Sequence, residues 1–179
     1  RDARRALGAR DSRFSFAAFD CEKIPAASES YDLVIANHVL FYCDNLENVC
    51  KEVRRVLKPG GRFLCSTYGN SHMKEISQLV SQFDERIVLS ANKLYEKFGR
   101  ENGAQVLEPW FSRVEWISYK DGLLVSDPEP LISYILSCHG NQNQYIVDRY
   151  KEFRTYVRKK TENGFHITKD AGIFIARKC

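Results

Sequence analysis

The sequence predicts an α/β domain built on a sheet with parallel strands, and three observations within residues 31–67 support this class. The first is an apolar run at Asp32–Ala36. The second is a set of four apolar residues at helical spacing, namely Leu46, Val49, Val53 and Val56. The third is the turn Lys58–Gly61, which is followed by the strand-like residues Arg62–Thr67. Two parallel strands joined by a helix form a right-handed crossover, the basic unit of such sheets.

The elements ahead of this unit are short. Asp2–Ala9 favours a helix, and the nearly continuous apolar run Phe14–Phe19 predicts a short buried strand. The strand at Asp32–Ala36 contains three successive apolar residues. That pattern is typical of a central parallel strand buried on both faces.

The helix after Asp32–Ala36 has recognisable ends. Asp44 is a suitable N-cap, and Glu47 stands three residues later, which is the spacing of a capping box. The turn at Lys58–Gly61 ends the helix because proline cannot continue it and glycine accepts the left-handed cap conformation.

The rest of the chain alternates helices and strands. Asp127 is expected to cap a helix that has Pro128 at its first position. The other expected helices are residues 71–83, 90–103 and 146–157. The expected strands are Phe111–Tyr119, Phe165–Ile167 and Ile173–Ala176, with a turn at Asp170–Gly172 between the last two. No repeat or low-complexity linker interrupts the sequence, so we expect one domain over residues 1–179.

Composition limits the function. The 179 residues are 44% hydrophobic and 28% charged, which is ordinary for a globular domain with its own core. No apolar run approaches the roughly 18 residues of a membrane span, and Arg1–Arg10 lacks a signal-peptide core. We therefore expect a cytoplasmic protein without membrane attachment. The basic ends, Arg1–Arg13 and Gln144–Cys179, fit solvated helix faces better than an anionic partner, and no motif indicates nucleic-acid binding.

The six cysteines are expected to be free thiols. They are Cys21, Cys43, Cys50, Cys65, Cys138 and Cys179. None forms a C-x-x-C pair and no histidine cluster accompanies them, so we expect no metal site. Buried free thiols behave as small hydrophobes and are typical of a reducing compartment.

One segment carries a family resemblance. Its motifs are Phe19–Cys21, Ile24–Pro25, Tyr31–Val34, Asn37–Leu40 and Val53–Gly61. Together they resemble class I S-adenosylmethionine-dependent methyltransferases, most closely the type 11 or ubiquinone-biosynthesis-like branch that acts on small molecules. The resemblance is strong over Phe14–Thr67 and looser beyond it, and RRVLKPGGRF is its most specific part.

The resemblance implies a Rossmann-like sheet of seven strands in the order 3-2-1-4-5-7-6, with the last strand antiparallel. The expected strands correspond to strand three (Phe14–Phe19), four (Asp32–Ala36), five (Arg62–Thr67), six (Phe111–Tyr119) and seven (Ile173–Ala176). Such sheets bind ligands at the carboxyl ends of their strands.

The resemblance also implies methyl transfer from S-adenosylmethionine to a small-molecule acceptor. The Asp20 carboxylate would accept a hydrogen bond from the adenine amine, and the Cys21 amide would donate one to a ring nitrogen. The Asn37 carbonyl would receive the methionyl amino group, with His38 beside it as a further cofactor contact. Simpler interpretations stay open, since Asp20 also suits a turn and His38 a partly buried loop.

The residues that bind the acceptor are assigned less closely than those that bind the cofactor. Phe41 and Tyr42 follow strand four and either line the mouth of the cofactor or substrate site or pack on the next helix. Tyr42, Trp110 and Tyr134 are candidate pocket aromatics, and Tyr68–Gly103 and Asp121–Gln144 are candidate lid segments. Methyl transfer needs in-line alignment and exclusion of water, so no catalytic triad is required. A base is needed only if the acceptor must lose a proton, and His38, His139 and His166 are the candidates.

The sequence also departs from the family. It contains no G-x-G, and only 13 residues precede strand three, so the glycine-rich loop and strands one and two are missing. The expected sheet is therefore truncated to strands three to seven, with an exposed apolar edge on strand four. This chain alone should then bind S-adenosylmethionine weakly.

Three explanations for the missing strands stay open: a longer parent protein, a second copy that covers the open edge as a homodimer, or a displaced N-terminal segment. Two other functions also stay open. One is a nicotinamide-dependent oxidoreductase, which would need a G-x-G-x-x-G turn. The other is a non-catalytic, self-associating methyltransferase-like interaction module.

Overall fold

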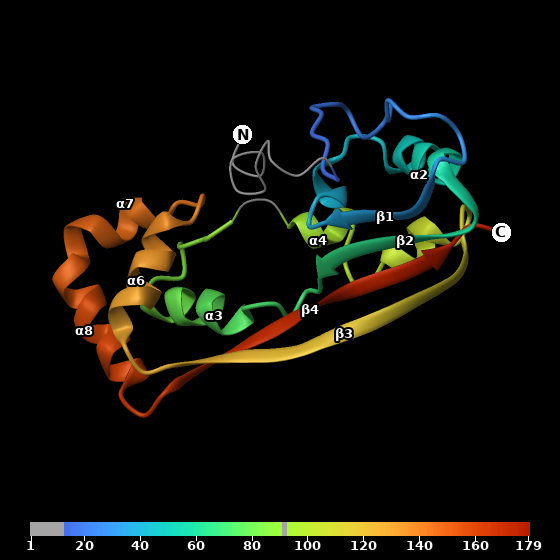
Figure 1. The fold of residues 1–179 in the computed structure, drawn as a ribbon. Helices are drawn as coiled ribbons and strands as arrows, with labels where there is room; N and C mark the ends of the chain where they lie inside the picture. The colour runs from blue at the N-terminus through green and yellow to red at the C-terminus, as the bar shows by residue number, and fades with distance from the viewer. Residues whose placement is uncertain (1–12, 91–92) are drawn as a thin grey trace.

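The computed structural model describes residues 13–90 and 93–179, which form a four-stranded mixed sheet with helices at both ends (Figure 1). The strands are β1 (Tyr31–Asn37), β2 (Leu57–Tyr68), β3 (Ser112–Val125) and β4 (Phe165–Arg177). The longer helices are α2 (Leu46–Val56), α3 (Lys74–Phe83), α6 (Pro128–Ser137) and α8 (Tyr150–Thr161). The short ones are η1 (Leu40–Tyr42), α4 (Leu94–Lys97), α5 (Gly103–Leu107), α7 (Gln142–Ile146) and η2 (Val147–Arg149). The helix expected at Asp2–Ala9 lies outside the described residues, as does all but the last residue of the basic segment Arg1–Arg13.

The strand order is β1-β2-β4-β3. β1 pairs with β2 in parallel, whereas β4 runs antiparallel to both β2 and β3. This is the order 4-5-7-6 that the sequence predicts, with the last strand inserted antiparallel between its neighbours. Both the α/β class and this part of the topology are confirmed.

Two strand predictions are wrong. Phe14–Phe19 forms no strand, and Phe14 and Phe19 are 45% and 54% exposed. None of the four described strands pairs with this segment, so it does not join the sheet. β1 is not buried on both faces, because its only partner among the described strands is β2 and Ile35 is 54% exposed. The predicted exposed apolar edge is therefore present.

The turn expected at Asp170–Gly172 is also wrong, because β4 passes straight through it. Asp170 pairs with Lys120 and Gly172 pairs with Ser118 in the long antiparallel β3–β4 ladder. A Cβ at Gly172 would overlap the Trp116 ring and the Ile117 carbonyl. The glycine therefore serves close strand packing rather than a turn.

The helix predicted between the two parallel strands is present as α2, with its cap shifted by one residue. Asn45 rather than Asp44 is the N-cap, and its Oδ1 accepts a hydrogen bond from the Asn48 amide at 3.0 Å. At the other end β2 begins at Leu57, so the Lys58–Gly61 turn is part of the strand. Gly60 has φ +76°, a left-handed conformation that favours glycine. The predicted Asp127 cap of α6 is confirmed by its 3.0 Å hydrogen bond from the Glu129 amide.

The buried residues form two clusters at opposite ends of the β3–β4 pair (Figure 1). The first cluster joins α2 and α5 to one face of the sheet around Val53, Phe63 and Phe174. The second joins α3, α6 and α8 around Ile76, Ile135 and Phe153. The two expected lid segments thus contribute α3 and α6 to the second cluster. Their role as a lid stays a prediction.

The opposite face of the sheet carries exposed apolar residues, beside charged ones such as Arg62 and Glu115, and is uncovered in the described structure. Alternate residues of each strand share this face, including Leu33 and Ile35 of β1 and Ile117 and Tyr119 of β3. All four are more than a third exposed. At the end of the molecule that contains β1 and α2, the described helices pack on one face of the sheet and leave the other face open.

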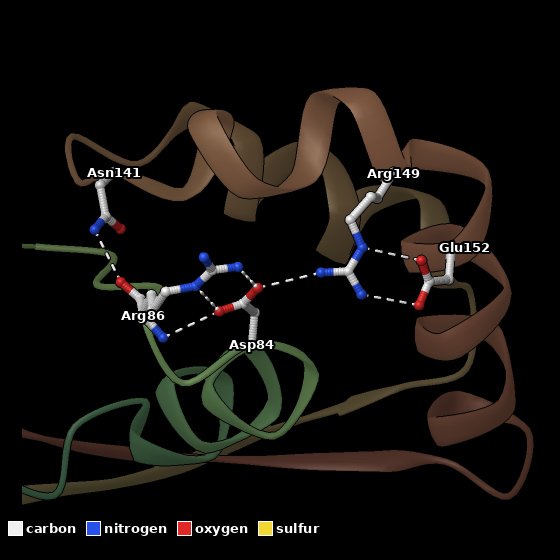
Figure 2. A network of polar contacts seen from close by, with 5 residues as sticks. All are labelled: Asp84, Arg86, Asn141, Arg149 and Glu152. Atoms are coloured by element: carbon white, nitrogen blue, oxygen red, sulfur yellow. Dashed lines mark hydrogen bonds and ion pairs between the residues drawn. The ribbon is translucent and has the colours of Figure 1, made fainter.

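A polar network fastens α3 to α8 (Figure 2). The Asp84 carboxylate accepts hydrogen bonds from Arg86 Nε at 2.9 Å and Nη2 at 2.7 Å, and from Arg149 Nη1 at 3.2 Å. Arg149 also pairs with Glu152, and Asn141 Nδ2 donates to the Arg86 carbonyl at 2.9 Å. The Arg86 guanidinium holds the pKa of Asp84 well below its usual range.

No helix within residues 13–90 and 93–179 combines the length and the apolar character that a bilayer crossing requires.

Candidate functional site

The site begins where the parallel strands β1 and β2 end side by side. Asn37, the last residue of β1, pairs with Ser66 of β2. The next amide, that of His38, donates to both Ser66 Oγ at 3.0 Å and the Ser66 carbonyl at 3.3 Å. His38 has φ +48°, a strained conformation for a residue with a side chain. The turn after β1 is therefore fixed against β2.

The structure brings the Asp20–Cys21 segment to this turn. Cys21 Sγ lies 3.2 Å from Cys43 Sγ, at the end of the η1 turn. The neighbouring Glu22 Oε1 accepts a hydrogen bond from the Asn45 amide at 2.9 Å, which ties the same segment to the start of α2. The Asp20–Cys21 segment thus lies against the residue that ends η1, and Cys43 Sγ in turn contacts the Val39 carbonyl in the turn after β1.

Asp20 makes a local contact of its own. Its Oδ1 accepts a hydrogen bond from the Glu22 amide at 2.9 Å, so the carboxylate closes a turn. Among the described residues, Oδ2 accepts no hydrogen bond. The side chain is exposed and retains one oxygen for a ligand.

Phe41 and Tyr42 point to different environments. Phe41 is only 4% exposed and packs edge-on against Tyr68 and Tyr42, with ring centroids 5.5 and 4.7 Å away. Tyr42 is 67% exposed. Packing thus accounts for Phe41, whereas Tyr42 is open to a ligand.

A cavity that the sequence did not predict adjoins the end of β2. It has a volume of about 730 Å³, in the size range of small-molecule sites, and lies between α3, the loop that follows α3, and the end of α6. Its lining includes Tyr68, His72, Met73, Ile76, Tyr95 and Tyr134. Of these residues, the sequence indicates only Tyr134 as a pocket aromatic. Tyr68 could have been found by position, since it ends β2 as Asn37 ends β1, but α3 and α6 are far apart in sequence.

Aromatic contacts link this cavity to the turn after β1. The Tyr68 ring centroid lies 6.3 Å from that of His38 and 5.2 Å from that of His72. Burial lowers the pKa of His72, which keeps the imidazole neutral around pH 7. A neutral histidine that lines a cavity can exchange a proton with a ligand.

The end of β2 is held by the segment after α4, which is itself paired with β4. Thr67 Oγ1 donates to the Phe98 carbonyl at 2.7 Å, and the Arg100 amide donates to the Tyr68 carbonyl at 3.2 Å. Arg100 Nη1 also pairs at 2.8 Å with Asp170, a carboxylate only 7% exposed in the middle of β4. These contacts fix Tyr68 at the mouth of the cavity.

The other candidates lie elsewhere. His139 is exposed between α6 and α7, and His166 pairs with Leu124 in the β3–β4 ladder. Neither lines the 730 Å³ cavity. The Trp110 carbonyl accepts from Arg54 Nη1 at 2.6 Å, and Lys51 Nζ lies 5.3 Å from its ring, so Trp110 packs beside α2. No group of three or more possible metal ligands occurs in the described parts of the chain.

Comparison with known proteins gives consistent sequence matches. A family model described as "Methyltransferase domain" matches residues 1–65. The malonyl-[acyl-carrier protein] O-methyltransferase of Nitrosospira multiformis is 37% identical over 76 residues, which are 42% of this chain and 25% of that protein. The enzyme of the same name from Chlorobium luteolum is 26% identical over 149 residues, 81% of this chain and 52% of that protein. The chain therefore spans at most about half the length of these relatives.

Solved structures share the fold. A candidate methyltransferase from Bacillus halodurans superposes with a TM-score of 0.59 at 16% identity, covering 98% of this chain and 77% of that one. The [4+2]-cyclase SpnF gives a TM-score of 0.51 at 18% identity, covering 99% of this chain and 61% of that one. Identities this low establish the fold alone. The sequence matches confirm the resemblance to class I S-adenosylmethionine-dependent methyltransferases, and the solved structures confirm the corresponding fold.

Proposed function

We propose that this chain is part of the catalytic domain of an S-adenosylmethionine-dependent methyltransferase that acts on a small molecule. The observation that carries the proposal is that the Asp20–Cys21 segment reaches the turn after β1 through Cys43, whose Sγ contacts both Cys21 Sγ and the Val39 carbonyl. Both segments lie within the residues that match the methyltransferase family. Because the chain spans about half or less of its curated relatives, the proposal concerns the activity of the whole protein.

The residues present fit one wall of a cofactor site. The Asp20 carboxylate retains an oxygen for the adenine amine, and the Cys21 amide lies beside it to donate to a ring nitrogen. At the carboxyl end of β1, the Asn37 carbonyl and the His38 turn would receive the methionyl amino group. S-adenosylmethionine supplies an activated methyl group when bound. The chain contains no G-x-G, so we expect its affinity for the cofactor to be weak without further residues.

The 730 Å³ cavity is the acceptor site in this proposal. Tyr68 lines this cavity, and its ring also stacks near His38 in the turn after β1. The walls from α3 and α6 would hold the acceptor in line with the methyl group and exclude water. Tyr42 lies exposed on the same turn as Phe41 and would form the outer rim. His72 would receive the proton of an acceptor that must lose one.

The proposal also covers the location of the protein and its self-association. The protein would work in the cytoplasm, where its thiols remain reduced. The exposed residues of β1, including Ile35, could also pair with a second copy.

Calorimetric titration with S-adenosylhomocysteine tests the cofactor site. The whole protein should bind one equivalent, and Asp20→Ala should weaken binding about tenfold through loss of one charge-assisted hydrogen bond. Asp32→Ala is a matched control, because Asp32 is 83% exposed and pairs with Lys58 near the start of β1. No binding by the folded whole protein, or equal losses in the two variants, would contradict the proposal.

The acceptor site has a separate test. Tyr134→Ala should raise the KM for the acceptor while leaving the affinity for S-adenosylhomocysteine unchanged. Tyr150→Ala is the control, since Tyr150 is similarly exposed but does not line the cavity. A fall in cofactor affinity in Tyr134→Ala would place Tyr134 at the cofactor instead.

A further inference from the structure

Two cysteines are in direct contact although neither belongs to a C-x-x-C pair. Cys21 Sγ and Cys43 Sγ lie 3.2 Å apart, on segments separated by 22 residues. In a disulfide the two sulfur atoms are about 2.05 Å apart, so a bond needs an approach of only about 1.2 Å from the observed distance. We propose that Cys21 and Cys43 form a site of reversible oxidation, closing to a disulfide in response to a hydroperoxide.

The two thiols differ in access. Cys43 is 6% exposed, and its Sγ also contacts the Val39 carbonyl at 3.6 Å. Burial, with the neighbouring Cys21, raises the pKa of Cys43 to about 12, so it remains a protonated thiol at neutral pH. Cys21 is the more exposed of the pair and therefore meets a peroxide first.

The Cys21–Cys43 disulfide forms in two balanced steps. Cys21 Sγ attacks one oxygen of hydrogen peroxide, the O–O bond breaks, and a sulfenic acid and one water form. Cys43 Sγ then attacks the Cys21 sulfur, the S–O bond breaks, and the hydroxide leaves as water with the Cys43 proton. In total two thiols are oxidised by two electrons, one peroxide is reduced to two waters, and an added thiol reverses the change.

The other cysteines lack this arrangement. Cys50 and Cys65 are at most 1% exposed, which shields them from peroxide. Cys138 is partly exposed, but its Sγ donates to the Tyr134 carbonyl at 3.4 Å. Cys179 is exposed, and in the described structure no other sulfur contacts it. Within the described chain, we therefore expect the disulfide to form between Cys21 and Cys43 rather than between other cysteines.

The disulfide has a consequence that rests on the proposed function. Cys43 is flanked by the buried residues Leu40 and Phe41 and by the start of α2, so the approach must come mainly from the partly exposed Cys21 segment. That movement shifts the Cys21 amide, which we assign to the adenine. Oxidation should then weaken binding of S-adenosylhomocysteine by the whole protein about tenfold, the equivalent of one hydrogen bond.

Peptide mapping without reduction tests the site directly. Trypsin cleaves after Lys23, which separates the two cysteines, but the peptide with Cys43 also holds Cys50. Cys50→Ser is therefore the matched control. After treatment with hydrogen peroxide, the cross-linked peptide pair should appear in the unmodified protein and in Cys50→Ser. It should be absent from Cys21→Ser and Cys43→Ser, and dithiothreitol should remove it.

The outcomes distinguish failure of the oxidation site from failure of the proposed function. Accumulation of Cys21 sulfenic or sulfinic acid without the cross-link, or cross-links between other cysteines, would overturn the proposed site. A cross-link that leaves the affinity for S-adenosylhomocysteine unchanged would refute its effect on the cofactor wall. A cross-link in a folded whole protein that never binds S-adenosylhomocysteine would refute the proposed function while the oxidation site stands.

Discussion

Phe174 offers the sharpest test of how the sheet is held together, and we expect Phe174→Ala to be strongly destabilising. The side chain is 1% exposed on β4 and lies where three elements meet. Its ring centroid is 4.7 Å from that of Trp116 on β3 and 5.9 Å from that of Phe98, whose carbonyl accepts from Thr67. A Cβ placed on Gly103 of α5 would overlap the same ring. The substitution therefore removes contacts with the sheet, α5 and the loop after α4 together.

The expected magnitude follows from burial. A buried phenylalanine removes roughly 150–250 Å² from water, worth about 4–6 kcal/mol at about 25 cal/mol per Å² as an upper bound. Measured losses for comparable substitutions are about 3–5 kcal/mol, and each aromatic pair adds roughly 0.5–1.5 kcal/mol to what the area alone would give. We expect Phe174→Ala to lower the free energy of unfolding by about 4 kcal/mol.

Urea denaturation followed by circular dichroism measures this loss. Phe19→Ala is the control, because Phe19 is 54% exposed and should change the free energy by no more than about 0.5 kcal/mol. Gly103→Ala should also destabilise the chain, but less so in the Phe174→Ala background, where the overlapping ring is gone. A loss below about 2 kcal/mol for Phe174→Ala, or strict additivity of the pair, would refute this account of the core.

Three further predictions concern the polar network around Asp84, the turn after β1 and the open edge of β1. Because the folded pKa of Asp84 is depressed, its stabilising contribution is present above the unfolded pKa of about 4 and is lost as the pH falls below it. Asp84→Asn should thus lower the urea midpoint at pH 7 but reduce its drop between pH 5 and 3, and an unchanged pH profile would contradict this. His38→Gly should raise the free energy of unfolding by about 1 kcal/mol in urea titrations by relieving φ +48°, whereas His38→Ala should not. If β1 pairs with a second copy, light scattering should show a dimer that Ile35→Lys converts to a monomer, and a monomeric unmodified chain would exclude this pairing.

The sequence alone determined the local elements whose signals are strong and contiguous. The apolar run of β1, the apolar repeat of α2 and the cap at Asp127 all use residues close together in the chain. Their hydrogen bonds and periodicity are local, so a short window contains the information. The resemblance then supplied the strand order, which local signals cannot.

Errors arose where a neighbouring strand decides the conformation. Phe14–Phe19 reads as a strand but has no ladder, whereas Asp170–Gly172 reads as a turn but is carried through by pairing with Lys120 and Ser118. Strand formation depends on partners distant in sequence, and turn propensity is too weak to override a 14-residue neighbour such as β3.

The candidate site divides in the same way. The family resemblance singles out Asp20, Asn37 and His38 through motifs that are contiguous in the chain, so these residues are accessible to sequence reasoning. The cavity between α3 and α6, the aromatic link through Tyr68 and the contact of Cys21 with Cys43 exist only after packing. Each of these features joins segments that are far apart in the chain, and no periodic pattern in the sequence indicates that they meet. Their proximity is set by burial of apolar faces and by the register of the sheet, and these are properties of the folded chain as a whole.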